Sequence, residues 1–176
     1  MSISLQPTLS NERVKLTPLK KEDFDGLYEA ASDPLIWEQH PASDRWKREV
    51  FEGFFAGGMN SGGAFLIRDA QTNEIIGSSR YNGYDAEQSC VEIGWTFFKR
   101  SHWGGRYNQA TKDLMLGHAF SFVDEVLLYA GEKNFRSCRA IERIGGVQRG
   151  VRDDGGSISL RYVVTPEAYA QSSSNR

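Results

Sequence analysis

Cysteine is scarce in this chain of 176 residues, where only Cys90 and Cys138 occur. Two cysteines so far apart form neither a disulfide framework nor a metal-binding motif. The three histidines are also scattered along the chain, so they add no cluster of ligands. We therefore expect no metal site, and a reducing compartment such as the cytoplasm.

Long hydrophobic runs are also missing. No stretch approaches the ~20 apolar residues that a membrane-spanning helix needs. The first nine residues lack the basic start and apolar run of a signal peptide. The formal net charge is −2, so no general attraction to nucleic acid is expected. A local basic cluster could still bind a small polyanion.

Aromatic residues, by contrast, are plentiful: ten Phe, seven Tyr and four Trp can fill a substantial core. The length fits one domain. We expect a single domain over residues 1–176, with its folded core at about 12–165. The serine-rich end at residues 171–176 is expected to fray.

Hydrophobic periodicity and turn residues predict the order of the elements. Strands are expected at residues 14–19, 64–68, 75–81, 90–97, 126–130, 147–152 and 157–164. Helices are expected at roughly 21–31, 45–56, 107–122 and 134–144. Short polar turns join the strands at 64–68, 75–81 and 90–97, which indicates an antiparallel meander. This order predicts an α+β fold with one strand–helix–strand crossover in its second half.

The segment at residues 97–107 is the most informative part of the chain. A strand, a glycine-rich loop and a helix follow one another there, which is how a chain presents free backbone N–H groups to an anion. Lys99, Arg100 and Arg106 add positive charge, and the glycines allow close approach of a phosphate. The arrangement suits a pyrophosphate; the alternative is a plain loop with solvated basic residues.

A second helix start, at Asn134, carries two interpretations. Asparagine is a good N-cap residue, and its amide could instead bind an amide-rich ligand at a strand end. Arg136, Arg139 and Arg143 would lie on overlapping faces of the helix, where they either meet a phosphate or form a solvated surface.

The order of elements resembles the GNAT superfamily of N-acetyltransferases over residues 14–164. The segment from His102 through Trp103-Gly104-Gly105 to Asn108 is similar to the branch that contains the ribosomal-protein N-terminal acetyltransferases. The stretch from Asn134 to Gly146, with its Asn-x-x-Ser start, resembles the second signature of that branch. The resemblance implies a single GNAT-like domain with a mixed, mostly antiparallel central sheet of about seven strands and helices on both faces.

The loop departs from the pattern of the superfamily, which is Gln/Arg-x-x-Gly-x-Gly/Ala. Alignment on Gly104 puts Ser101 at the Gln/Arg position and Arg106 at the last glycine. Alignment on Arg100 puts Trp103 where the first glycine belongs. If the loop binds a pyrophosphate as the resemblance implies, one backbone contact to it would be altered and Arg106 would compensate.

The resemblance implies that acetyl-CoA is the cofactor. It would lie where the strand at 90–97 splays from the strand at 126–130, with its pyrophosphate on the loop at 100–106. The implied cofactor-binding residues are Trp95, Thr96, Phe97, Arg100, Trp103, Gly104, Gly105, Arg106, Tyr107, Asn108, Asn134 and Arg136.

Catalysis by the same resemblance would use Glu92 as the base, acting through water, and Ser137 as the donor to the departing thiolate. Glu92 could instead make an ordinary cross-strand contact, and Ser137 could satisfy the first turn of its helix. Many relatives use a tyrosine seven residues after the asparagine as general acid, but Ile141 stands there. A backbone N–H near residues 95–97 would stabilise the oxyanion.

The acceptor pocket implied by the resemblance would be lined by Trp37, Arg80, Tyr81 and Tyr84, although such aromatics can simply belong to the core. We expect the acceptor to be a primary amine, at a protein N-terminus or on a small molecule, and the protein to be a monomer or homodimer. A non-catalytic acyl-CoA-binding or sensor domain is the alternative. A nucleotide-phosphate-binding domain is a third reading, which the absence of a phosphate-loop lysine signature disfavours.

Overall fold

A computed structural model describes residues 2–175 of the chain. Its strands are β1 (Leu9–Ser10), β2 (Val14–Pro18), β3 (Ala64–Asp69), β4 (Ile75–Asp85), β5 (Cys90–Phe98), β6 (Glu125–Gly131), β7 (Val147–Asp153) and β8 (Ile158–Val164). Its helices are α1 (Phe24–Ala31), α2 (Arg48–Ser61), α3 (Arg106–Ala119), α4 (Phe135–Arg143) and α5 (Pro166–Ser174). Three short 3-10 helices are η1 (Lys21–Asp23), η2 (Pro34–Ile36) and η3 (Arg100–His102).

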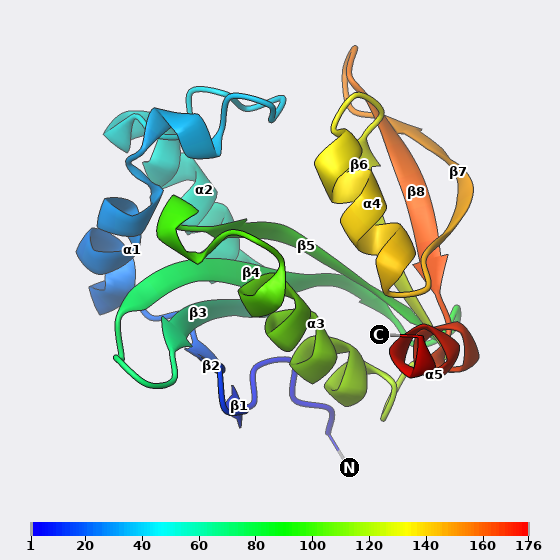
Figure 1. Ribbon diagram of the computed structural model, residues 1–176. Helices are drawn as coiled ribbons and strands as arrows, with labels where there is room; N and C mark the ends of the chain where they lie inside the picture. The colour runs from blue at the N-terminus through cyan, green and yellow to red at the C-terminus, as the bar shows by residue number, and fades with distance from the viewer. Residues whose placement is uncertain (1, 176) are drawn as a thin grey trace. The chain divides into compact units, whose positions relative to one another are not determined.

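Hydrogen bonding connects the strands in the order β1-β2-β3-β4-β5-β6-β8-β7 (Figure 1). The pair β5–β6 is parallel, whereas β1–β2, β2–β3, β3–β4, β6–β8 and β7–β8 are antiparallel. The predicted α+β class and mixed, mostly antiparallel sheet are therefore confirmed. The sheet has eight strands rather than about seven because the two-residue β1 is too short to leave a periodic signal.

The chain divides into two compact units. The first contains the residues up to 82 together with 94–117, and the second contains 83–93 and the residues from 118 on. Among the described residues, no helix combines the length and apolar character that crossing a bilayer requires.

In the first unit, helices cover both faces of the sheet. Successive side chains of β3 point to opposite faces, so the strand packs against helices on each side. Leu66 belongs to the core beneath α1 and α2. Its neighbour Phe65 points to the other face, where its ring meets that of Tyr81. The Tyr81 hydroxyl donates to the carbonyl of Met115 in α3. Helices α1 and α2 therefore lie on one face, and α3 lies on the other.

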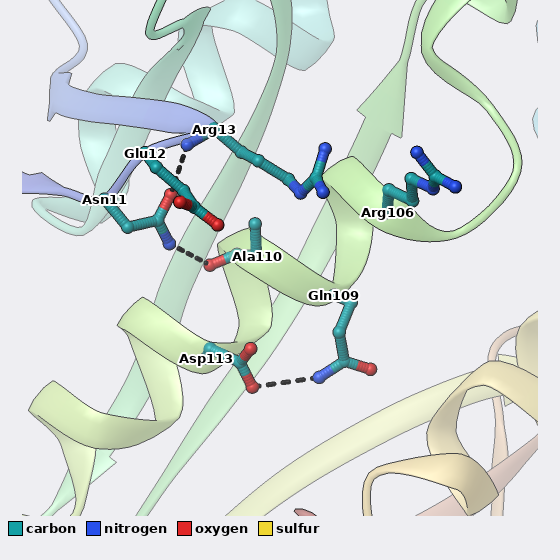
Figure 2. A pocket seen from close by; sticks show the side chains of 7 residues that line it. All are labelled: Asn11, Glu12, Arg13, Arg106, Gln109, Ala110 and Asp113. Atoms are coloured by element: carbon teal, nitrogen blue, oxygen red, sulfur yellow. Dashed lines mark hydrogen bonds between the residues drawn. The ribbon is translucent and has the colours of Figure 1, made fainter. Parts of the chain in front are cut away.

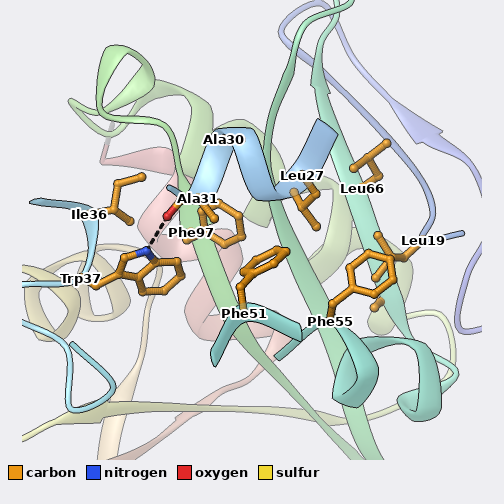
Figure 3. Close-up of a cluster of buried hydrophobic side chains, with 11 residues drawn as sticks. Leu19, Leu27, Ala30, Ala31, Ile36, Trp37, Phe51, Phe55, Leu66 and Phe97 are labelled. Carbon is orange, nitrogen blue, oxygen red and sulfur yellow. Dashed lines mark hydrogen bonds between the residues drawn. The ribbon is translucent and has the colours of Figure 1, made fainter. Parts of the chain in front are cut away.

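The core between the sheet and the first two helices is rich in aromatic rings (Figure 3). Phe51 and Phe55 lie four residues apart on α2, so one face of that helix is apolar. Phe24 of α1 packs edge-on against Phe55, with ring centroids 5.0 Å apart. The helix α2 ends at Gly62, whose φ of 68° is left-handed.

In the second unit, β6 alternates between buried and half-buried residues, and α4 packs against it (Figure 1). The edge strand β7 pairs with β8 with a register shift between Gln148 and Val151. The exposed Gly150, at φ 120°, lies inside this bulge.

The structure differs from the predicted elements at α2 and at the end of the chain. The helix expected at 45–56 begins at Arg48 and continues to Ser61, because left-handed Gly62 is the residue that stops it. Helix α5 was not expected; it includes residues 171–174 of the end expected to fray, and fraying there stays a prediction, while residue 176 lies outside the described part. The side chain of Thr165 accepts from the Ala168 N–H at 3.2 Å and caps this helix.

Candidate functional site

The loop between β5 and α3 keeps its backbone open. Gly104 and Gly105 have φ values of 109° and 94°, and a Cβ on either residue would meet no heavy atom within 4 Å. Helix α3 begins at Arg106, directly after the two glycines. The first N–H groups of a helix have no acceptor inside it and carry the positive end of the helix dipole. The loop therefore has the backbone geometry of an anion site.

The basic residues around this loop differ in their contacts. Lys99 Nζ lies 2.6 Å from Glu74 Oε1, and Arg100 pairs with Asp33. The Arg100 guanidinium lowers the pKa of the Asp33 carboxyl. The exposed Arg106 has no side-chain partner among residues 2–175. Lys99 and Arg100 would therefore have to leave their carboxylate partners to bind an anion at this loop, whereas Arg106 would not.

A groove of about 530 Å³ borders the start of α3 (Figure 2). Arg13, from the connection before β2, extends toward the beginning of α3, where Arg106 lies. Further along the helix, Gln109 donates to Asp113 at 2.9 Å. Asn11 fixes the wall of the groove because its amide donates to the Ala110 carbonyl at 3.1 Å.

Two aromatic residues, one in the loop and one in the first turn of α3, are held by hydrogen bonds. Trp103 Nε1 donates to the Phe98 carbonyl at 2.9 Å, and the Tyr107 hydroxyl donates to Asp69 Oδ2 at 2.9 Å. That bond raises the pKa of the Tyr107 hydroxyl. The half-buried Asn108 follows Tyr107 in the first turn of α3.

On β5, Trp95 has a φ of 53°, a left-handed conformation that is unusual for a bulky residue. The buried Arg80 guanidinium lies 4.4 Å from the centre of the Trp95 ring. A backbone outlier of this kind is frequent at functional sites. Phe97 is buried in the core, so it has a backbone rather than a side chain to offer a ligand.

Beside Trp95, the Thr96 hydroxyl joins two polar side chains. Its Oγ1 lies 2.8 Å from Ser79 Oγ and accepts from Lys112 Nζ at 3.0 Å. Burial lowers the pKa of Lys112 to about 8. The structure thus places a buried amine next to the strand position that the sequence predicts to bind the cofactor.

In the second unit, Glu92 lies on β5 opposite Leu127 of β6, with its side chain 13% exposed. Its Oε1 lies 3.6 Å from an Arg152 guanidinium nitrogen. That guanidinium also pairs with Asp154 at 2.8 Å and lies over the Tyr129 ring. Glu92 is thus a nearly buried carboxylate with a positive neighbour.

The start of α4 shows the N-cap that is one of the two interpretations of Asn134. Asn134 Oδ1 accepts from the Ser137 N–H at 3.3 Å. Ser137 is half-buried, and Arg136 is exposed on the same turn. Asn134 therefore has a structural role, and binding of a cofactor amide by this residue stays a prediction.

The residues predicted for an acceptor pocket lie in different environments. Trp37 and Tyr81 are 2% and 0% exposed, with their polar atoms bonded to the Ala31 and Met115 carbonyls. Arg80 is also buried, and it donates to the Phe54 carbonyl. Tyr84 is half-buried and packs edge-on against Phe122 in the second unit. Packing accounts for Trp37 and Tyr81, and acceptor binding by all four stays a prediction.

Three residues of interest were missed by sequence reasoning. Lys112 left a legible signal, because it shares a helix face with the buried Met115 and Ala119. Asp69 and Arg13 left none. Their partners at α3 are distant in sequence, and no local pattern reports such contacts.

The sequence of this chain matches the model of a known protein family. A family model described as an acetyltransferase (GNAT) domain matches residues 13–147. Among proteins of curated function, none matches the chain in sequence.

Solved structures share the fold at low sequence identity. An acetyltransferase of the GNAT family from Bacillus anthracis has a TM-score of 0.75 at 19% identity, over 92% of this chain and 99% of that one. RimJ from Mycobacterium smegmatis, in complex with CoA-disulfide, has a TM-score of 0.76 at 17% identity, over 100% and 98%. The spermidine/spermine N-acetyltransferase SpeG from Vibrio cholerae has a TM-score of 0.67 at 16% identity, over 93% and 99%. Because the family model covers most of the chain, this protein belongs to the GNAT acetyltransferase family.

Proposed function

We propose that this protein transfers an acetyl group from acetyl-CoA to a primary amine, either a protein N-terminus or a small molecule. The observation that carries the proposal is the open loop at Gly104 and Gly105, directly before α3. Its backbone N–H groups suit the pyrophosphate of coenzyme A, as does Arg106, which has no side-chain partner within residues 2–175. Acetyl-CoA is the acyl donor of the family to which the chain belongs.

The other predicted cofactor residues belong to the same proposal. Trp95, Thr96 and Phe97 would meet the pantetheine and acetyl groups through their backbone, and Asn134 would offer its amide. These cofactor-binding roles are taken from the resemblance to the ribosomal-protein acetyltransferase branch. A neighbour that acts on spermidine has the same fold, so either acceptor class is compatible with the architecture. We also propose a cytoplasmic location and a monomeric or dimeric state.

The reaction would require a neutral amine, which would add to the thioester carbonyl and place negative charge on its oxygen; the C–S bond would then break, and coenzyme A would leave as a thiolate. Glu92, through a water molecule, would take the proton from the amine. A backbone N–H at residues 95–97 would stabilise the oxyanion. Ser137 would donate to the thiolate. An α-amine, with a pKa of about 8, needs a weaker base than a lysine, with a pKa near 10.4.

The binding step is tested by thermal melting with acetyl-CoA, ATP or adenosine. A ligand at a hundred times its Kd stabilises the folded state by about 2.7 kcal/mol. For a chain of this size we expect a shift of several degrees, at roughly 2–4 °C per kcal/mol. Acetyl-CoA should produce this shift, and Asn134→Ala should diminish it. No shift with saturating acetyl-CoA would remove the proposal.

The catalytic step is tested by the release of coenzyme A thiol in the presence of α-amines and polyamines. We expect turnover by the wild type and a loss of about a hundredfold or more in Glu92→Gln, in line with the usual effect of a general base. Ile141, which is buried at the usual tyrosine position, favours a non-catalytic acyl-CoA sensor as the second candidate. Binding of acetyl-CoA without turnover of any amine would select that candidate.

A further inference from the structure

Asp69 ends β3 and lies at the centre of a polar cluster in the first unit. The residue is 6% exposed. Its Oδ1 accepts the backbone N–H groups of Gln71 at 2.8 Å and Thr72 at 3.2 Å. Its Oδ2 accepts the Tyr107 hydroxyl at 2.9 Å and lies 3.4 Å from His102 Nε2. One carboxylate therefore joins the turn after β3 to η3 and to the first turn of α3.

The two loop-side partners of Asp69 stand on either side of the glycines. His102 ends η3 before Gly104 and Gly105, and Tyr107 follows them as the second residue of α3. The rings of His102 and Tyr107 also meet edge-on, with centroids 4.7 Å apart. Glycines have the largest conformational freedom to lose. Holding both ends of this short segment restricts that freedom before any ligand arrives.

The charge of Asp69 defines how it can act. The Gln71 N–H, followed by the Tyr107 hydroxyl and the Thr72 N–H, holds the pKa of this carboxyl below its usual range. The group is therefore an anion at neutral pH. An anion repels phosphate, so Asp69 cannot itself hold one. Any effect on a phosphate ligand must pass through the loop that His102 and Tyr107 carry.

We infer that Asp69 is a positioning residue for the acyl-CoA phosphate loop, acting through His102 and Tyr107 to keep the backbone N–H groups at residues 104–107 open to phosphate. The inference rests on the proposed function. It adds a residue outside the loop on which the affinity for coenzyme A depends.

The chain offers a matched control in Asp85, which makes the same kind of turn. Its Oδ1 accepts the N–H groups of Glu87 at 2.9 Å and Gln88 at 3.0 Å. Asp69→Asn and Asp85→Asn both keep an oxygen that can accept these turn bonds. In Asp69→Asn, however, the anion that receives Tyr107 and lies against His102 is lost.

The experiment measures the Kd of acetyl-CoA by calorimetry for the wild type, Asp69→Asn, Tyr107→Phe, the double variant and Asp85→Asn. We expect the Kd to rise about tenfold in each single variant, which corresponds to about 1.4 kcal/mol. The double variant should be little weaker than either one, because both changes remove the same contact. Asp85→Asn should bind as the wild type does. Tyr107→Phe keeps the ring contact with His102, so it also supports the test if Asp69→Asn does not fold.

Acetyl-pantetheine, which lacks the pyrophosphate, separates positioning from general damage. The kcat/KM of Asp69→Asn should fall about tenfold with acetyl-CoA and stay at the wild-type value with acetyl-pantetheine. An equal loss with both donors, or an unchanged Kd for acetyl-CoA, would overturn the inference and leave the proposed function in place. A wild type that binds no acetyl-CoA would overturn both.

Discussion

Lys112 is a lysine on a buried face of α3. Its ammonium donates to Thr96 Oγ1 at 3.0 Å, and no carboxylate pairs with it among the described residues. A buried charge without a counter-charge is costly. This cost is the reason why burial lowers the pKa of Lys112 to about 8.

The pKa of Lys112 has a consequence for stability. Between pH 8 and the unfolded value of 10.5, the unfolded chain binds more protons than the folded one, so the free energy of unfolding rises with pH. The full cost, about 3 kcal/mol, is present below pH 8. We therefore expect Lys112→Met to be roughly 2 kcal/mol more stable than the wild type at pH 7, since the variant also loses the bond to Thr96.

Urea denaturation at pH 7 and pH 10 checks this prediction, with the exposed Lys133→Met as a control. The advantage of Lys112→Met should largely disappear at pH 10, whereas Lys133→Met should match the wild type at both values. A Lys112→Met protein that is less stable than the wild type at pH 7 would show that the hydrogen bond to Thr96 outweighs the burial of the charge.

At the scale of elements, the close approach of β4 and β5 depends on Gly77. A Cβ at this position would lie 2.0 Å from the Phe97 carbonyl oxygen and 3.2 Å from the Phe98 Cα. Both atoms belong to the backbone, so a side-chain movement could not make room for the added Cβ. Gly77 therefore fixes how close β5 can lie to its neighbour.

We expect Gly77→Ala to destabilise the fold by roughly 3 kcal/mol, in the range of severe overpacking. Gly53→Ala is the matched substitution, because a Cβ there meets nothing within 4 Å and the position is inside α2. It should stabilise the fold by about 0.5–1 kcal/mol. Melting temperatures of the two variants give the comparison, and equal effects would contradict it.

Sequence patterns predicted most elements because each of those elements carries its own period or its own cap. The strand at 14–19 alternates, and the helix at 134–144 has Asn134 before it and Gly145 after it. The last helix was missed although Thr165-Pro166 is a good helix start. The serine-rich composition after this start favours a frayed end and obscures the cap.

The candidate site could be predicted where a local motif carried it. The glycines before α3 are one example, and the cap at Asn134 is another. Asp69 and Tyr107 are separated by 38 positions and meet through folding alone, so their bond could not be predicted. The same holds for the Arg100–Asp33 pair, which occupies a charge expected to serve the phosphate.

At the scale of the whole molecule, the distribution of tryptophan allows the first unit to be observed separately. All four tryptophans, at positions 37, 46, 95 and 103, lie in the first unit. The strand β5 contributes residues to both units, since the division falls between Ile93 and Gly94. If this strand detached, both units would lose backbone hydrogen bonds between strands.

We therefore expect one cooperative transition. Urea unfolding followed by tryptophan fluorescence, which reports on the first unit, should coincide with unfolding followed by far-ultraviolet circular dichroism, which reports on both. Separate midpoints would mean that the chain contains two independently folding domains, against the single domain that we propose.

The edge strand β7 bears on whether molecules in a concentrated solution can pair through their sheets. Val147 and Val151 are 48% and 61% exposed there, and an outer strand ordinarily offers its unpaired backbone groups to a neighbouring chain. The bulge at Gly150 interrupts the straight row of those groups, and the exposed Arg149 adds a charge that repels its own copy. The most exposed strand of this protein is for these reasons a poor template for a sheet shared between molecules.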